Sequence, residues 1–478
     1  MSEQTPALAA TRTPLLTPLR VLLIVAVVAF IARFWVMAST CLVIENDGID
    51  YFSAARSHYF STLVISRFRT PGYPLFLYSS FKLFGIGAFG IMLLQHIAGA
   101  LTAVLVARIG LKLANPAFAL VSGLLCALDP TLALFGSVMQ TECLSVFLFV
   151  LCAALALCSD KRPFLGAAAL GCVLAFAILL RPTFQVVVPF FILAAAAGAG
   201  LSWFKRFAVV VGAVASLALC VAPWLAFNRD RGIGGFAEGG GSAFWISLVQ
   251  QDLVDRDYPL PPDVARRYEE VRPFHGASAE MWAFVARPAD SPEQQVRVKG
   301  ITKDWAIHSV RKDPLAYLAR MPYSFLWQMN YYPESGFIKE SQITWFSYMV
   351  SCDTDDFKAT IANFHFDGKT PGVEPLAMSG KDGVVREFYR WWGINHPRGF
   401  PQIPLMLFAL ATGVWALMTR RYALAFALLA SAALVGVHVA MLFHQGRYSL
   451  PSMAFWYAVW PVLPLEAWRR WFGRPVVA

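Results

Sequence analysis

Long apolar runs separated by short basic turns dominate the chain. A membrane-spanning helix needs about 20 mostly apolar residues. Such runs occupy residues 19–39, 88–111, 116–135, 140–158, 163–180, 184–203, 206–227, 397–418, 423–443 and 449–467. The pattern therefore predicts an all-α polytopic membrane protein, a bundle of about ten transmembrane helices.

The basic turns orient these helices. Threading them alternately from a cytoplasmic start places Lys161 with Arg162, Lys205 with Arg206, and Arg420 on one side. Cytoplasmic loops carry an excess of Lys and Arg, so this side is predicted to be cytoplasmic.

Two longer segments are left on the opposite, outer face. The loop 40–87 holds an apolar stretch too short to span, which predicts interfacial helices, and 229–396 is the only long polar region. The predicted organisation is a cytoplasmic N-terminus (1–18), a transmembrane module (19–228), one large outer insertion (229–396), and C-terminal helices with a cytoplasmic tail (397–478).

Composition agrees with a membrane protein and excludes a soluble one. Hydrophobic residues make up 57% of the chain and charged residues 15%, against about 25% charged in soluble domains. The net charge of +10 lies mainly in the cytoplasmic turns. Nucleic-acid binding is therefore not expected.

The eight cysteines divide between the helices and the outer face. Cys41 and Cys352 fall on the outer face, where disulfides persist, but sequence cannot decide whether they pair. No Cys or His cluster has zinc-site spacing, so no metal site is predicted from this pattern.

The loop after the first helix contains two carboxylates three residues apart. Asp47 and Asp50 would share a face of one helical turn. Carboxylates at a membrane surface suit a general base or a cation ligand. The alternative is a solvated loop with helix-capping Asp residues.

Two arginines precede a rigid Pro-Gly turn in the same loop. The guanidinium fork of Arg67 and of Arg69 matches the oxygens of a phosphate. Alternatively, both side chains extend to lipid headgroups.

Further ionisable residues lie at helix ends on the same face. Glu142 begins one predicted helix, Arg181 ends the next, and Arg447 lies between the last two. Such groups usually face a protein interior or a watery cavity, although each could be an interfacial anchor. Asp129 is also on this face, but a role as a helix cap before a turn is enough to explain an Asp at this position.

Together these segments resemble the GT-C superfamily of membrane glycosyltransferases, in particular the bacterial branch related to protein O-mannosyltransferases and lipid A aminoarabinose transferase. Weaker support comes from Arg181-Pro182 and residues 223–228. The motifs that carry the resemblance are Asp47-Gly-Ile-Asp-Tyr-Phe-Ser-Ala-Ala55, Arg69-Thr-Pro-Gly-Tyr-Pro-Leu-Phe76, Thr141-Glu142 and Arg447-Tyr-Ser-Leu-Pro451.

The resemblance implies roles for these residues. Asp47 is implied as the catalytic base, with Asp50 as second candidate. The basic residues implied to meet the donor phosphate are Arg67, Arg69, Arg181 and Arg447, and those implied to line the site are Glu142, Tyr51 and Tyr448. No cofactor is required, although some superfamily members use a divalent cation and the two carboxylates could ligate one.

The implied reaction is inverting transfer of a sugar from a polyprenyl-phosphate carrier, here undecaprenyl phosphate, to an acceptor lipid, glycan or protein. The implied location is the bacterial inner membrane, multi-pass, among membrane lipids, with the site facing the periplasm. Two alternatives stay open: a transporter or flippase of lipid-linked sugars, and a non-catalytic scaffold subunit. A transporter would show internal repeats and ionisable groups near mid-membrane, and the sequence is expected to have neither, since the charged residues sit at helix ends.

Overall fold

The computed structural model describes most of the helical part of the chain. The described residues are 16–40, 42–45, 47–48, 51–52, 54–55, 69–159, 161–198, 201–237, 240–271, 284–285, 291–329, 347–350, 401–442 and 446–472.

The N-terminal half begins with three closely packed helices, α1 (Pro18–Ser39), α4 (Ala88–Leu113) and α5 (Pro116–Leu128). Small residues let them approach. A Cβ at Gly123 would lie 2.7 Å from Val25 Cγ2, and one at Gly110 would lie 3.0 Å from Ala119 Cα. Because lipid is as apolar as the side chains, such close van der Waals packing, rather than exclusion of water, holds the helices together.

The run predicted as one helix over 116–135 is broken. After α5 the chain bends by 52° into α6 (Pro130–Leu134) and a 3₁₀ turn, η1 (Phe135–Ser137). Asp129 caps α6, since its carboxylate accepts a hydrogen bond from Leu132 N at 2.8 Å. A proline that follows a capping residue starts a new helix rather than continuing the old one.

Four elements complete this half: α7 (Glu142–Cys158), α8 (Pro163–Leu180), α9 (Val188–Ala196) and α10 (Trp203–Asp230). The predicted helix 184–203 differs from the structure, where a 3₁₀ segment, η2 (Pro182–Val187), precedes a shorter α9. Pro182 ends α8 because its nitrogen has no hydrogen to donate to the helix.

The C-terminal helices pack back against this half. They are α19 (Gln402–Met418), α20 (Tyr422–Ala440), the 3₁₀ turn η5 (Gly446–Ser449), α21 (Leu450–Val459) and α22 (Val462–Phe472). The predicted helix 449–467 is divided at Trp460-Pro461, again at a proline. α21 is almost wholly buried and contacts both α4 and α7.

The chain is a multi-pass membrane protein. Within the described ranges, five helices are long and apolar enough to cross a bilayer, or six when α5 and the bent segment after it count as one span. Glu142–Cys158, Pro182–Ala196 and Gln402–Met418 are apolar but shorter. Each of the ten predicted segments contains helix in its described part. Only five or six of these helices are long enough to cross a bilayer. The boundaries of the predicted regions stay predictions.

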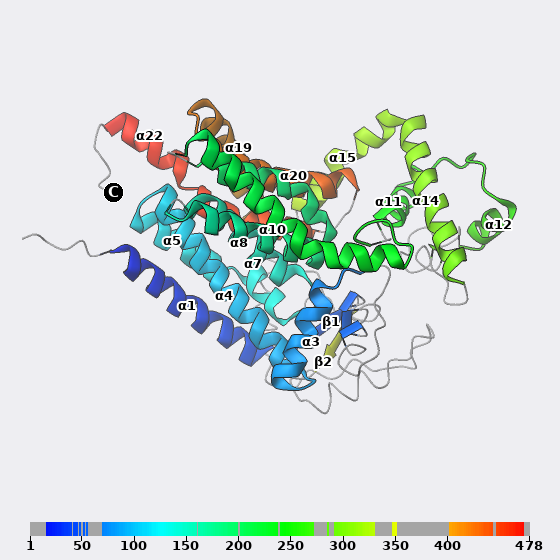
Figure 1. The fold of residues 1–478 in the computed structure, drawn as a ribbon, viewed down its shortest axis with the longest axis horizontal. Coiled ribbons are helices and arrows are strands. Elements are labelled where there is room, and N and C mark those ends of the chain that lie inside the picture. Colours follow the sequence, from blue (N-terminus) through cyan, green and yellow to red (C-terminus); the bar gives the residue numbers. More distant parts are fainter. Residues whose placement is uncertain are drawn as a thin grey trace, which may run out of the picture.

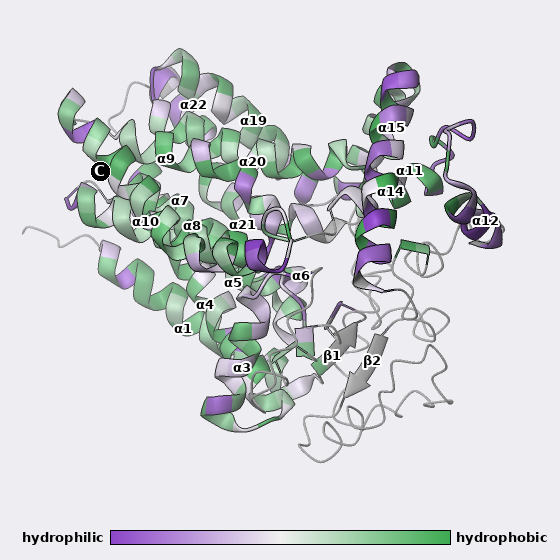
Figure 2. Cartoon of the chain, turned by 45° about the vertical axis from the view of Figure 1, so that its right-hand side comes forward, coloured by the Kyte–Doolittle hydropathy of each residue, from purple (hydrophilic) through white to green (hydrophobic). Residues whose placement is uncertain are grey.

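Outside the bundle, the large insertion forms a lobe with its own core. It contains α11 (Gly240–Gln250), α12 (Pro262–Val271), α14 (Pro292–Lys312) and α15 (Pro314–Met329). Trp245 and Trp305 are at the centre of this core. Figure 1 shows the lobe at the end of the bundle opposite α22, and Figure 2 shows its α12 and α14 as far more hydrophilic than the bundle.

The first outer loop contributes the predicted short helix and an unexpected strand. The apolar stretch that is too short to span a membrane forms helix α3 (Gly72–Phe84). Strand β1 (Leu42–Glu45) pairs antiparallel with β2 (Ser347–Val350), so the fold is not purely α and the loop is tied to the large insertion. Cys41 and Cys352 lie outside the described residues, and their disulfide stays a prediction.

Candidate active site

An ion pair joins the two ends of the first outer loop. Arg69 Nη2 lies 2.6 Å from Asp47 Oδ1. The two side chains are 27% and 34% exposed, so the pair is open to solvent. Asp47 lies two residues after β1, and Arg69 lies three residues before α3.

A second ion pair links the ends of two membrane helices. Arg181 Nη2 lies 2.9 Å from Glu142 Oε1, with side-chain exposures of 15% and 2%. Glu142 is the first residue of α7, where the helix dipole favours a negative charge. Arg181 directly follows α8, where the dipole favours a positive one.

Tyr51 contacts the first ion pair and lies within electrostatic range of the second. The Arg69 guanidinium is 5.2 Å from the centre of its ring. Burial raises the pKa of Tyr51, the Arg69 and Arg181 charges lower it, and the Asp47 and Glu142 charges raise it. All four charged groups therefore act on one phenol, which shows that residues from distant parts of the sequence converge.

The C-terminal half reaches the same place through aromatic stacking. Arg181 lies 4.6 Å from the ring centre of Tyr448, on η5, and the Tyr448 ring stacks on His438 of α20 at 4.4 Å. A guanidinium over an aromatic face is attracted to the ring electrons, which fixes its orientation. Arg181 is thus held by a carboxylate and by a ring from different halves of the chain.

Three predicted site residues are not placed. Asp50 and Arg67 lie outside the described residues. The backbone of Arg447 belongs to η5, but its side chain also lies outside the part that the structure describes. The roles predicted for them stay predictions.

Asp129 is a helix cap, as the structural alternative for this residue predicted. Besides capping α6, its other carboxylate oxygen accepts a hydrogen bond from the Tyr457 hydroxyl at 2.8 Å. Both carboxylate oxygens are therefore engaged inside the bundle.

Buried polar residues within the helices escaped the sequence analysis. Arg33 is 1% exposed in the interior of α1, and its guanidinium donates to the Leu132 carbonyl. Gln95 and His96 are fully buried in α4. The expectation that charged residues sit only at helix ends is therefore wrong. A polar residue inside an apolar run was the available signal, because such groups are costly in a membrane unless they are paired.

The described part of the chain contains no group of three or more potential metal-ligating side chains. What it assembles is a partly exposed carboxylate, Asp47, paired with the Arg69 guanidinium, and a second guanidinium, that of Arg181, which acts on the same Tyr51 phenol. A carboxylate can accept a proton from a hydroxyl, and guanidinium groups can stabilise charge that develops on a phosphate.

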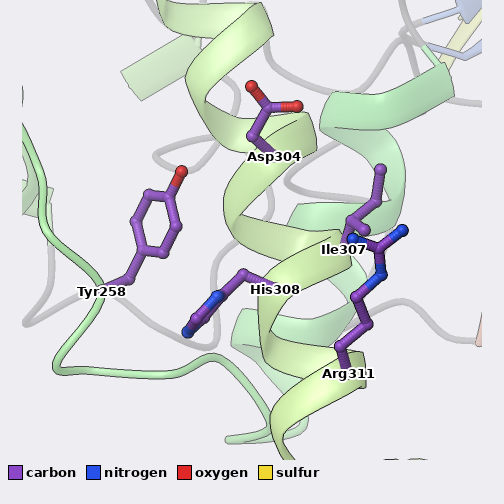
Figure 3. A pocket seen from close by; sticks show the side chains of 5 residues that line it. All are labelled: Tyr258, Asp304, Ile307, His308 and Arg311. Carbon is purple, nitrogen blue, oxygen red and sulfur yellow. The ribbon is translucent and has the colours of Figure 1, made fainter.

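The outer lobe carries a separate, open cavity of about 270 Å³ (Figure 3). It is lined by Tyr258, Asp304, Ile307, His308 and Arg311, all of them lobe residues. No predicted site residue lines it.

Comparison with known proteins finds a family match over part of the chain. Residues 68–227 match the family described as dolichyl-phosphate-mannose-protein mannosyltransferase. The matched segment contains Arg69, Glu142 and Arg181. The match covers about one third of the chain, and it agrees with the resemblance to the GT-C superfamily over that segment.

The chain is also similar to solved structures, at low identity. The oligosaccharyltransferase AglB from Archaeoglobus fulgidus, in complex with an inhibitory peptide and a dolichol-phosphate, is 13% identical with a TM-score of 0.46 over 96% of this chain. This chain covers 52% of AglB, about half its length. ArnT from Cupriavidus metallidurans, bound to undecaprenyl phosphate, is 14% identical with a TM-score of 0.39, over 89% of this chain and 77% of ArnT. No curated protein matches the chain.

Proposed function

We propose that the protein transfers a sugar from a polyprenyl-phosphate carrier to an acceptor at the outer face of a bacterial inner membrane. The observation that carries the proposal is the convergence of Asp47, Arg69, Glu142 and Arg181 around Tyr51. The ten helical segments would then form the bundle, with the shorter ones crossing where the bilayer is locally thinned. Undecaprenyl phosphate is the proposed carrier.

Asp47 is proposed as the base. A neutral sugar or lipid hydroxyl is a poor nucleophile, and a carboxylate that takes its proton in the transition state typically accelerates transfer by about 10²–10⁴-fold. The hydroxyl oxygen attacks the anomeric carbon as the bond to the lipid phosphate breaks, so that the configuration inverts. The proton passes to Asp47 and the lipid phosphate departs.

The arginines are proposed to stabilise the leaving group. Negative charge on the phosphate grows as the glycosidic bond breaks, so a fixed guanidinium binds the transition state more tightly than the ground state. Arg181 is already fixed by Glu142 and Tyr448, which reduces the reorganisation needed when the donor arrives. Arg69, and Arg67 and Arg447 by resemblance, would complete the phosphate site.

The test is a transfer assay with the full chain in lipid nanodiscs. The probes are radiolabelled undecaprenyl-phosphate sugars, with bacterial membranes as the source of acceptor. We expect Asp47→Asn to lower transfer by about 10²-fold or more. The matched control is Asp252→Asn, which removes a carboxylate paired with Arg256 at 2.6 Å on the outer lobe and should transfer normally.

Near-normal transfer by Asp47→Asn and Asp50→Asn variants, singly and together, would refute the base assignment. Wild-type chain that transfers no sugar from any donor would refute the function. The proposed reaction needs no cofactor, so a chelator should leave the rate unchanged. A rate that falls with chelator and recovers with added Mg²⁺ or Mn²⁺ would instead assign a cation to Asp47 and Asp50.

A further inference from the structure

Gln95 of α4 is buried, and its side-chain amide is fully hydrogen-bonded. Its Oε1 accepts from the Tyr73 hydroxyl at 2.7 Å. Its Nε2 donates to the carbonyls of Gly136 at 3.0 Å and Val138 at 2.9 Å. With one acceptor and two donors all engaged, the amide has a single orientation that satisfies its partners.

One side of Gln95 leads to the first ion pair. Tyr73 lies in α3 and is completely buried, and burial raises its pKa well above the usual value, so the phenol remains a neutral donor. Its ring meets the Tyr51 ring edge to face at 5.0 Å. Tyr51 in turn contacts the Arg69 guanidinium, which pairs with Asp47. Contacts therefore run without a break from Gln95 to Asp47.

The other side leads to the second ion pair. Gly136 and Val138 belong to the segment that enters α7, and Glu142 is the first residue of that helix. Cys143, the next residue, donates from its thiol to the backbone carbonyl of Gln95 at 3.1 Å. Gln95 is therefore hydrogen-bonded once to the first turn of α7 and twice to the segment that precedes it.

We propose that Gln95 is a positioning residue that fixes the two ion pairs relative to each other. The inference rests on the proposed function. Asp47 and Arg69 lie on loop segments and Glu142 on a membrane helix, and Gln95 is hydrogen-bonded toward both. Because a displacement of about 1 Å in a reacting group can cost about 10²-fold in rate, loss of this link should slow transfer without removing any charged residue.

The competing explanation is an ordinary buried hydrogen bond that only stabilises the fold. The chain offers a matched control for it on the same helix, two turns further along. The Thr102 hydroxyl is buried and donates to the Ala98 carbonyl of its own helix at 2.9 Å. Thr102→Val therefore removes a buried hydrogen bond of α4 that does not lead to either ion pair.

The experiment compares Tyr73→Phe, Gln95→Met and Thr102→Val, each as full chain in nanodiscs. Transfer is measured as kcat and donor KM, stability as thermal inactivation, and local order as amide hydrogen exchange in peptides covering 42–45 and 69–76. Tyr73→Phe, which removes a single oxygen atom, keeps the test decisive if Gln95→Met fails to fold.

We expect Tyr73→Phe to lower kcat by about tenfold or more, to leave donor KM within about threefold, and to speed exchange in both peptides. Thr102→Val should lose comparable thermal stability while kcat stays within about twofold of wild type. Equal kcat for Tyr73→Phe and Thr102→Val, whether reduced or normal, would overturn the positioning role while wild-type transfer still supports the function. The exchange could instead be faster in Tyr73→Phe but not in Thr102→Val, while the wild-type chain is inactive on every donor. That result would support the positioning role and refute the proposed function.

Discussion

The two ion pairs of the candidate site are built differently. Asp47 and Arg69 belong to loop segments and are about one third exposed, whereas Glu142 and Arg181 belong to helix ends and are nearly buried. An exposed pair is screened by water and contributes little to stability. A buried pair is expensive to break, because the remaining partner is left as an uncompensated charge.

This difference suits different tasks. A base must exchange its counterion for a substrate proton, and a loosely held carboxylate such as Asp47 can do so at low cost. A guanidinium that orients a phosphate should not move, and Arg181 is fixed by both Glu142 and the Tyr448 ring. Under the proposed function, the comparison therefore assigns the chemistry to the more exposed pair and the positioning of the phosphate to the more buried pair.

The largest effect is expected when the fixed pair is broken. Glu142→Gln leaves the Arg181 guanidinium nearly buried without its carboxylate, and should lower the free energy of unfolding by about 3 kcal/mol. Asp47→Asn, the matched variant of the exposed pair, should change it by less than about 1 kcal/mol. Thermal inactivation in nanodiscs measures both.

A double variant separates the effect of the second ion pair on stability from its effect on transfer. Glu142→Gln with Arg181→Met removes both charges and should recover much of the stability lost in the single variant, while transfer stays low. If Glu142→Gln alone were as stable as wild type, the second pair would not be a rigid element of the site.

A smaller effect is expected from exchanging arginine for lysine in the two pairs. Lysine keeps the charge but loses the planar fork and the stacking on an aromatic ring. Arg181→Lys should raise donor KM about tenfold, and Arg69→Lys about threefold, since Arg181 is the less exposed of the two and lies closer to its ring, at 4.6 Å against 5.2 Å. Initial rates against donor concentration give the values.

The control for this exchange is at the other end of the bundle. Arg421 lies 4.4 Å from the Trp415 ring centre and 3.3 Å from Glu466, so it has the same kind of partners away from the site. Arg421→Lys should leave donor KM unchanged. An equal effect of all three substitutions would mean that general packing, rather than phosphate binding, is being measured.

The smallest effect is expected on the pH dependence of stability, and it involves an ion pair of the outer lobe, separate from the two ion pairs of the candidate site. Lys312 Nζ lies 2.6 Å from Asp255 Oδ1, and this hydrogen bond holds the pKa of Asp255 below its usual value. The stabilisation is therefore present above the ordinary Asp pKa of about 3.9, and it is lost as pH falls through the lowered pKa of the folded lobe.

Acid unfolding of the lobe, followed by Trp fluorescence, should accordingly shift toward neutral pH in Lys312→Met. The Asp255→Asn variant should lose this part of the pH dependence. Transfer activity at neutral pH should remain normal in both variants, because neither residue contacts either candidate ion pair. An unchanged acid midpoint in Lys312→Met would remove Asp255 as the responsible group.

Helix positions followed from the sequence, because their causes are local. The prediction for residues 163–180 coincides with α8, and that for 19–39 with α1 to within one residue. In a membrane every backbone group must be satisfied within its own helix, so an apolar run of sufficient length has few alternatives. The prolines at 130, 182 and 461 were visible in the sequence, but the breaks that they cause were not predicted.

The placement of the charged residues on one face was also predictable, since topology follows from the basic turns. Their pairing was not. Nothing in the sequence says that Asp47 pairs with Arg69 and Glu142 with Arg181, that β1 pairs with β2, or that Gln95 lies between the two pairs. These contacts join residues far apart in the chain, and they depend on how close the helices approach at small residues such as Gly99, where a Cβ would lie 3.1 Å from Arg33 Nη1.

By itself the sequence determined a multi-pass membrane bundle, and it predicted an orientation and a set of candidate site residues, because hydrophobic length and charge bias act one segment at a time. Only the tertiary structure decided which carboxylate is exposed and which is buried, and which arginine pairs with each. That outcome depends on the close packing of separate helices, in which the position of each side chain is set by its neighbours from other parts of the chain.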